Sequence, residues 1–242
     1  MPSTSARRAA ATAVALLLLV VTTGCAVDGT AQPAPNIRPR PLTGDSVKKV
    51  LLSTDELSKL LGQTFKADSD SPNRFGGRDL LFEMHASPQE CNGVVFELQK
   101  SAYGSASVGN VGRATWWEAG SGRGKAISVS ETVVALAKPG DADALLANFS
   151  STWKRCDGTT VTDYVAGGER LSTAAISNVQ AADSVLSATV NSHSTTTLVR
   201  GRAVGARVNC LVEAQVTFFG NRADNSAAEV AHRMMDKVSD LS

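Results

Sequence analysis

Hydrophobic and polar residues alternate along several stretches of the chain, most densely in its last third. A period of two is typical of a strand that turns one face to a hydrophobic core. We predict strands over residues 111–119, 127–137, 159–164, 174–179, 184–191, 195–203 and 207–219. In the first of these, Trp116 and Trp117 are expected on opposite faces. In the second, Ile127, Val129, Glu131, Val133 and Ala135 share one side.

Other stretches have the period of an amphipathic helix. Residues 50–62 contain Ser53 and Glu56, spaced as in a capping box, and Gly62 is suited to end a helix there. Residues 224–240 are predicted to form the closing helix of the chain. The segment 88–100 is ambiguous, because its apolar residues have helical spacing without a clear end.

A further helix is predicted after Pro139 and Gly140, with Asp141 placed to cap it. Its apolar positions Leu145, Phe149 and Trp153 lie four apart, so they form one buried stripe.

These elements indicate the fold class. About three or four helices and six or more strands follow one another with short connections, and few strand–helix–strand units repeat. We therefore expect an α+β fold in a single domain, with an antiparallel sheet and helices packed on one of its faces. No internal repeat is present.

The first 25 residues have the three parts of a secretory signal. Arg7 and Arg8 precede a short apolar run over 13–21, and Gly24 is followed directly by Cys25. A small residue before cysteine resembles the lipobox of bacterial lipoproteins, although Thr22 replaces the usual leucine. We expect residues 1–24 to be a signal peptide that is removed and Cys25 to carry a lipid such as palmitate. The alternative is an ordinary secreted protein cut near the same cysteine.

The segment after Cys25 is rich in proline and poor in apolar residues. We interpret residues 25–46 as a lipidated, flexible tether and residues 47–242 as the folded domain. The expected location is the cell membrane, on its extracytoplasmic side, with the lipid as the membrane partner. No second apolar stretch reaches the length of about 20 residues that a bilayer requires.

Charge and composition exclude some partners. The chain has 24 basic and 23 acidic residues, and removal of residues 1–24 would take away two of the basic ones. The mature chain would then have a net charge near −1, which provides no basic surface for nucleic acid. Aromatic residues make up only 5% of the chain, a low share for a surface that stacks on bases.

Motifs of common catalytic and metal sites are missing from the sequence. The three histidines, His85, His193 and His232, are far apart, and neither Cys-x-x-Cys nor His-Glu-x-x-His occurs. We expect no metal and no cofactor. No Gly-x-Ser-x-Gly elbow is present either.

A hydrolase remains the alternative function, because paired carboxyl groups need not be close in sequence. Glu131, Glu213 and Asp183 are the candidate members of such a pair, and His193 would have to converge with them. Nothing in the sequence selects these residues.

Three arginines near a predicted strand turn, Arg200, Arg202 and Arg207, have two interpretations. They form a small anion-binding patch, or they are solvated residues of an edge strand, where cations block unwanted pairing. The second interpretation is the simpler one.

Four cysteines occur: Cys25, Cys91, Cys156 and Cys210. With Cys25 assigned to lipid, three remain in a compartment that permits disulfides. They form one bridge and one thiol, or three thiols.

Two cysteine contexts resemble one known family. Ser87–Phe96, with its Pro-x-x-Cys-x-Gly-Val spacing, resembles one segment of that family, and the helix ending in Trp153-Lys154-Arg155-Cys156 resembles another. The family is the PknH-like extracellular sensor domain, the outer part of certain mycobacterial serine/threonine kinases, which also occurs alone as a lipoprotein of the mycobacterial cell envelope. The resemblance covers roughly residues 51–238.

The resemblance implies a twisted antiparallel sheet, a ligand-type cleft, ligand sensing in the kinases and no catalysis in the domain itself. It also implies a disulfide between Cys91 and Cys156. A second disulfide of the kinase members has no counterpart here, and the sequence contains neither a kinase domain nor a transmembrane helix. Cys210 lies on an apolar strand face and is interpreted as a buried thiol, with a bridge to another partner as the alternative.

The leading hypothesis is therefore a lipid-anchored envelope protein that is not an enzyme. Its sensor-like domain would bind a small ligand or an envelope protein, at residues that the sequence does not identify. The alternatives are a hydrolase acting on cell-wall or lipid material and an adaptor with an exposed apolar patch.

Overall fold

The computed structural model describes residues 39–70, 72–120, 125–218 and 223–242. The predicted signal peptide, Cys25 and most of the predicted tether lie outside these ranges. Within them, no helix combines the length and the apolar composition needed to cross a bilayer.

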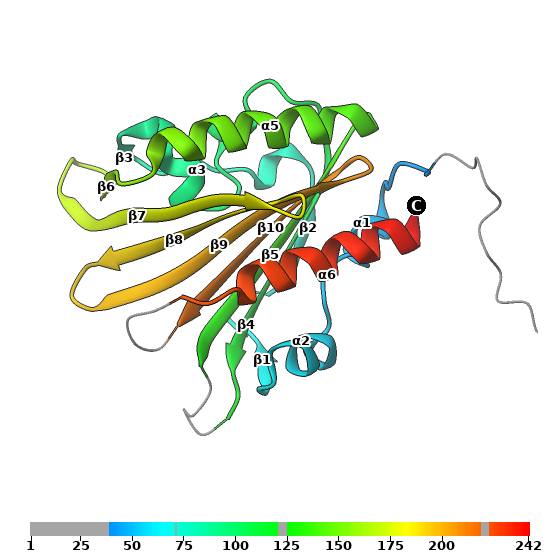
Figure 1. The fold of residues 1–242 in the computed structure, drawn as a ribbon, viewed down its shortest axis with the longest axis horizontal. Helices are drawn as coiled ribbons and strands as arrows, with labels where there is room; N and C mark the ends of the chain where they lie inside the picture. Colours follow the sequence, from blue (N-terminus) through cyan, green and yellow to red (C-terminus); the bar gives the residue numbers. More distant parts are fainter. Residues whose placement is uncertain (1–38, 71, 121–124, 219–222) are drawn as a thin grey trace, which may run out of the picture. The chain divides into compact units, whose positions relative to one another are not determined.

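One antiparallel sheet of ten strands organises the described residues (Figure 1). The strands in chain order are β1 (Phe65–Ala67), β2 (Arg74–Gly76), β3 (Ala86–Ser87), β4 (Val108–Glu118), β5 (Ala126–Leu136), β6 (Thr160–Tyr164), β7 (Arg170–Ala182), β8 (Val185–His193), β9 (Thr197–Arg207) and β10 (Cys210–Phe218). Across the sheet their order is β1-β4-β5-β10-β9-β8-β7-β6-β3, and β2 also pairs with β4. The short strands β1 and β3 form its edges, so the long strands are paired on both sides.

Helices and helical turns lie before, between and after the strands. They are α1 (Asp45–Lys48), α2 (Thr54–Leu61), the 3₁₀ turns η1 (Arg78–Leu80) and η2 (Gln89–Cys91), α3 (Asn92–Val95), α4 (Lys100–Tyr103), α5 (Pro139–Cys156) and α6 (Ser226–Leu241). The two long helices, α5 and α6, carry most of the packing against the sheet.

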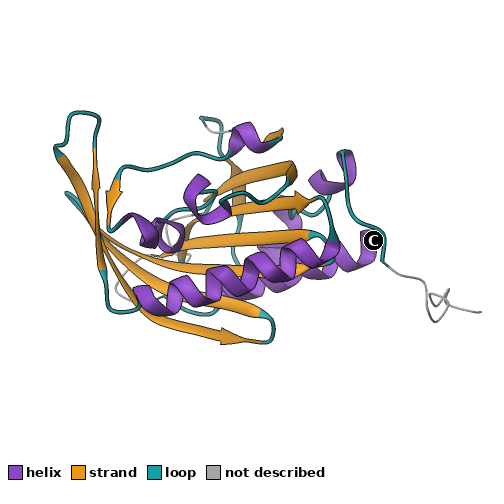
Figure 2. Cartoon of the chain, turned by 90° about the horizontal axis from the view of Figure 1, so that it is seen from above, coloured by secondary structure: helices purple, strands orange, loops and turns teal. Residues whose placement is uncertain are grey.

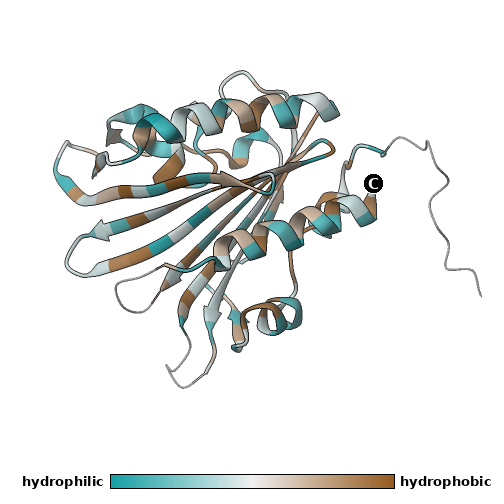
Figure 3. Ribbon diagram, in the orientation of Figure 1, coloured by the Kyte–Doolittle hydropathy of each residue, from teal (hydrophilic) through white to brown (hydrophobic). Residues whose placement is uncertain are grey.

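Helices cover both faces of the sheet, so the prediction of helices on one face is wrong. Along β10, Leu211 packs in the core under α5, whereas its neighbour Val212 packs in the core under α6. Figure 1 shows α5 above the strands and α6 across their lower part, and Figure 2 shows the sheet with its helices from above. The central strands bury both faces, which is why β10 has few solvent-facing positions. Figure 3 shows hydrophobic and hydrophilic residues alternating along many strands.

Helix α6 lies close to β9 because glycines face it. An added Cβ at Gly205 would lie 2.3 Å from Met235 Sδ, and one at Gly201 would lie 3.4 Å from Ala227 Cβ. The small residues let Val230, Met234 and the rest of this helix's apolar stripe reach the strand surface.

Several local predictions are confirmed. Ser53 caps α2 in a complete capping box with Glu56, and Gly62 ends that helix in the left-handed region at φ 65°. Trp116 is 6% exposed and Trp117 is 42% exposed, as expected for opposite faces of β4.

Two local predictions are corrected. Helix α5 begins at Pro139 with Lys138 as its N-cap, so Asp141 lies inside the first turn and does not cap it. Proline is favoured at this first position because its missing N–H has no partner in a helix anyway. The turn between β9 and β10 is at Val208 and Asn209, so the predicted last strand begins too early at Arg207.

Candidate functional site

A cavity of about 600 Å³ lies between α5 and the segment 101–107, and we call it the α5 cavity. Its floor is apolar and buried, and its rim is polar. The floor contains Gly93, Tyr103, Leu145, Phe149 and Trp153. The rim contains Glu90, Ser101, Ser105, Ser107, Asp141, Asn148 and Thr152. The volume is within the range of small-molecule sites, and a polar rim faces the apolar floor.

Helix periodicity and aromatic contacts build the floor. Leu145, Phe149 and Trp153 recur every fourth residue of α5 and are buried, as predicted. The Tyr103 ring meets the Phe149 ring edge-on, with centroids 5.6 Å apart, and the Phe149 and Trp153 centroids are 6.5 Å apart. These packed rings hold the floor in one shape.

Behind the floor lies a buried charge cluster, Glu97, Arg202 and Glu213. Arg202 is fully buried and its Nη2 lies 2.8 Å from Glu213 Oε2. The other Glu213 oxygen, Oε1, accepts hydrogen bonds from the Tyr103 hydroxyl at 2.6 Å and the Leu98 N–H at 3.1 Å. Tyr103 therefore links the cavity floor to the cluster, and burial raises the pKa of its hydroxyl well above the usual range.

Arg202 also fixes the chain that forms the floor. Its Nε donates to the Val94 carbonyl at 3.0 Å and its Nη2 to the Gly93 carbonyl at 3.3 Å. Its guanidinium carbon lies 5.8 Å from the Trp153 ring centroid, within cation–π range. The Arg202 side chain thus positions the Gly93 and Val94 carbonyls and the Trp153 ring at the floor of the cavity.

Glu97 is held less tightly than Glu213. Its Oε1 lies 3.7 Å from Arg202 Nη1 without a hydrogen bond, and its Oε2 accepts one from Ser130 Oγ at 2.7 Å. Arg113 Nε lies 3.8 Å from Oε2. Burial raises the pKa of Glu97, against the opposing effect of the two arginines. The neutral carboxyl is therefore favoured more at Glu97 than at an exposed glutamate.

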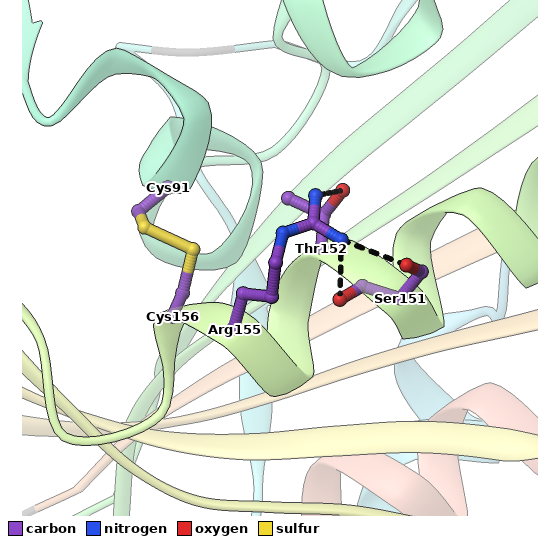
Figure 4. Close-up of a disulfide and its surroundings, with 5 residues drawn as sticks. All are labelled: Cys91, Ser151, Thr152, Arg155 and Cys156. Carbon is purple, nitrogen blue, oxygen red and sulfur yellow. Dashed lines mark hydrogen bonds between the residues drawn. A yellow bond between two sulfur atoms is a disulfide. The ribbon is translucent and has the colours of Figure 1, made fainter.

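A disulfide closes one end of this region. Cys91 and Cys156 are joined with an S–S distance of 2.06 Å across 65 residues, as the family resemblance implies. Figure 4 shows the bond at the end of α5, beside Arg155. Arg155 Nη2 donates to Thr152 Oγ1 at 3.2 Å, so a rim hydroxyl is held next to the bridge.

Comparison with known proteins gives the family. Residues 42–237 match the PknH-like extracellular domain. The chain belongs to this family. No curated protein sequence matches it.

One solved structure shows the same fold as this PknH-like domain. The extracellular domain of PknH from Mycobacterium tuberculosis is similar at a TM-score of 0.70 and 18% identity, with 84% of this chain and 100% of that chain covered. A putative uncharacterized protein from Mycobacterium smegmatis matches at a TM-score of 0.42 and 12% identity, over 80% of this chain and 96% of that chain. The family assignment indicates an extracytoplasmic domain.

The hydrolase candidates are not brought together in the PknH-like domain. Glu131 lies on the α6 face of the sheet and Glu213 on the α5 face. Asp183 is at the β7–β8 turn, and the exposed His193 pairs through Nδ1 with Thr197 Oγ1 at 2.9 Å. These four residues form no common site.

The three arginines do not form one patch. Strand β9 lies between β8 and β10, so the edge-strand interpretation is wrong. Arg202 is buried in the charge cluster, and Arg207 is exposed with its Nε donating to Ser239 Oγ at 2.6 Å. Arg200 is half-buried on the same face as Arg202. The sequence places the three arginines near a turn, but it does not show which strands lie beside the strand that contains them.

Cys210 and the histidines add no metal site. Within the described ranges, no group of three or more His, Cys, Asp or Glu residues is arranged to hold a metal ion. Cys210 is a buried free cysteine, and burial raises the pKa of its thiol to about 12.

The serine-rich rim went unrecognised in the sequence analysis. The segment Ser101–Ser107 contains three serines and Gly104, which adopts φ 50°. Clusters of small polar residues are also common in ordinary loops, so composition alone does not mark this segment as part of a site. The one signal in the sequence is its position after the segment that contains Cys91.

Proposed function

We propose that this chain is a lipid-anchored envelope protein whose PknH-like domain binds a small polar molecule in the α5 cavity without catalysing a reaction. The observation that supports it most directly is the cavity, whose aromatic floor is braced from behind by Arg202 and Glu213. A buried ion pair is costly unless it is well hydrogen-bonded, and this one fixes the shape of a concave site.

The rim favours a neutral or cationic ligand. Glu90 and Asp141 are the charged residues that line the cavity, and the described lining includes no lysine or arginine. Serine hydroxyls and the Asn148 amide can both donate and accept hydrogen bonds, as recognition of hydroxyl-rich or amine-bearing molecules requires. An anion would meet two carboxylates without a compensating cation.

A binding role fits the carboxyl groups better than catalysis does. Glu213 accepts hydrogen bonds from a tyrosine, a backbone N–H and an arginine, so its oxygens are already used inside the protein. Glu131 lies on the other face of the sheet. A hydrolase of the expected kind would need two carboxyl groups facing one bond.

A pair of tryptophan substitutions on α5 tests the proposal. Ala144 and Ala147 are both exposed on this helix, but Ala144 lines the α5 cavity and Ala147 lines a different one. The full chain is purified from the envelope of its host and examined by native mass spectrometry. We expect a bound small molecule in the wild type and in Ala147→Trp, and its loss in Ala144→Trp.

Thermal unfolding of both variants shows whether they fold normally. Returning the extracted molecule should change the tryptophan fluorescence of the wild type, because the Trp153 ring forms part of the floor. Equal occupancy in Ala144→Trp and Ala147→Trp would contradict the proposal.

A further inference from the structure

The α5 face of the sheet is open where α5 does not cover it. Strand register places Trp117, Ser128, Thr217 and Arg200 side by side across β4, β5, β10 and β9. We call these four residues the open row. Trp117 is 42% exposed, Ser128 and Arg200 are half-buried and Thr217 between them is 6% exposed, whereas the α6 face of the same strands is closed by residues such as Val129 and Val216.

Arg200 in the open row has no carboxylate partner. None of the described carboxylates lies within ion-pair distance of its guanidinium. Nη1 donates to Gln215 Oε1 at 3.4 Å, Nη2 donates to Ser192 Oγ, and the buried Nε has no partner among the described residues. The Phe96 ring centroid lies 6.0 Å from its guanidinium carbon.

The surroundings make this cation unfavourable. Burial and then the nearby charge of Arg202 lower the pKa of Arg200 to about 10, while the charges of Glu97 and Asp163 act in the other direction. A desolvated charge with neutral partners costs stability, unlike Arg202, which is paired with Glu213. Groups that cost stability in the unliganded protein are concentrated at sites that bind.

We propose that Arg200 anchors a second binding site, which takes the phosphate group of a ligand lying along the open row. A guanidinium matches such groups with two parallel N–H donors, and Arg200 Nη1 has only a long hydrogen bond, 3.4 Å to Gln215 Oε1, that a ligand oxygen can replace. The half-buried Ser128 lies on the same row, the Phe96 ring lies next to the guanidinium, and the exposed Trp117 lies at the β4 end of the row. None of these residues lines the α5 cavity, so the two sites are separate.

Two phosphate probes test the site and distinguish its source of ligand. Phenyl phosphate represents a free organic phosphate, and dihexanoylphosphatidic acid represents a lipid headgroup. Each is titrated into the full chain in nonionic detergent at constant ionic strength, with calorimetry as the readout. We expect saturable binding of at least one probe and a loss of affinity of at least tenfold in Arg200→Gln. If one probe binds more tightly than the other, it identifies whether the ligand is a free organic phosphate or a lipid headgroup.

Arg207→Gln is the matched control, because Arg207 lies on the same strand, on the other face, and is exposed. Its affinity should equal that of the wild type. Arg200→Lys keeps the charge but not the fork of donors, so an intermediate loss is expected. Circular dichroism melting shows that each variant is folded. Failure of both probes to bind, or equal binding by the wild type and Arg200→Gln, would overturn the proposal.

Discussion

Glu131 is the most unusual single residue on the α6 face of the sheet. It is completely buried among the apolar side chains that flank it along β5, as the alternation in the sequence predicted. Its Oε2 accepts the Leu52 N–H at 2.7 Å, which ties the start of α2 to the sheet. Burial raises its pKa from 4.5 to about 8, and the Leu52 hydrogen bond and the charge of Lys237 offset only part of that effect.

This pKa predicts a pH-dependent stability. Between pH 4.5 and pH 8 the folded protein keeps a proton on Glu131 that the unfolded chain releases, so the free energy of unfolding falls as the pH rises. The slope is at most about 1.4 kcal/mol per pH unit. Because Glu131→Gln cannot ionise, its stability relative to the wild type should rise by up to about 4 kcal/mol between pH 5 and pH 8.

Urea denaturation at several pH values measures this difference. Glu169→Gln is the control, because Glu169 is exposed in the β6–β7 turn and should leave the pH dependence unchanged. A stability difference between Glu131→Gln and the wild type that stays constant from pH 5 to pH 8 would show that Glu131 does not titrate in this range.

At the scale of elements, the disulfide fixes the geometry of α5. It joins the last residue of this helix to the 3₁₀ turn that precedes α3, and both flank the α5 cavity. Closing a loop across 65 residues is worth roughly 4 kcal/mol in the chain-entropy model. The double variant Cys91→Ser/Cys156→Ser should lose stability of that order, as measured by chemical denaturation.

Reduction separates this effect from other consequences of the substitutions. Dithiothreitol should destabilise the wild type and Cys210→Ala, which both retain the bridge, and should leave the double variant unchanged. Equal sensitivity of all three proteins to the reductant would be inconsistent with a stabilising Cys91–Cys156 bond.

Local signals predicted some elements well and others badly. The capping box of α2 and the four-residue stripe of α5 act within one helix, so the sequence was sufficient for both. The β9–β10 turn was misplaced because Val208, a β-branched residue, occupies its first position at φ 54°. Asn209 compensates through its side chain, which hydrogen-bonds Leu136 and the backbone of Leu42.

At the scale of the whole molecule, the candidate sites depend on pairings that sequence alone cannot supply. The α5 cavity needs a helix from the middle of the chain, a serine-rich loop before it and Arg202 from a strand after it. Arg202 and Glu213 come together because β9 and β10 are neighbours and both side chains point to the α5 face. In the sequence the two residues have no visible relation, and they are predicted separately, Arg202 as an edge cation or anion ligand and Glu213 as a candidate catalytic acid.

The attachment of this module to a membrane is a prediction about the region before residue 39. If Cys25 carries two or three acyl chains, each buried CH₂ contributes about 0.8 kcal/mol and the protein should remain in the membrane fraction. Cys25→Ala removes the acceptor thiol, so the protein should shift to the soluble or secreted fraction while its domain stays folded.

Fractionation with immunoblotting measures the shift, and mass spectrometry of the N-terminal peptide detects the acyl groups directly. Cys210→Ala is the control, since Cys210 is buried within the domain and should leave the distribution unchanged. Retention of Cys25→Ala in the membrane until detergent is added would mean that something other than a lipid on this cysteine holds the protein there.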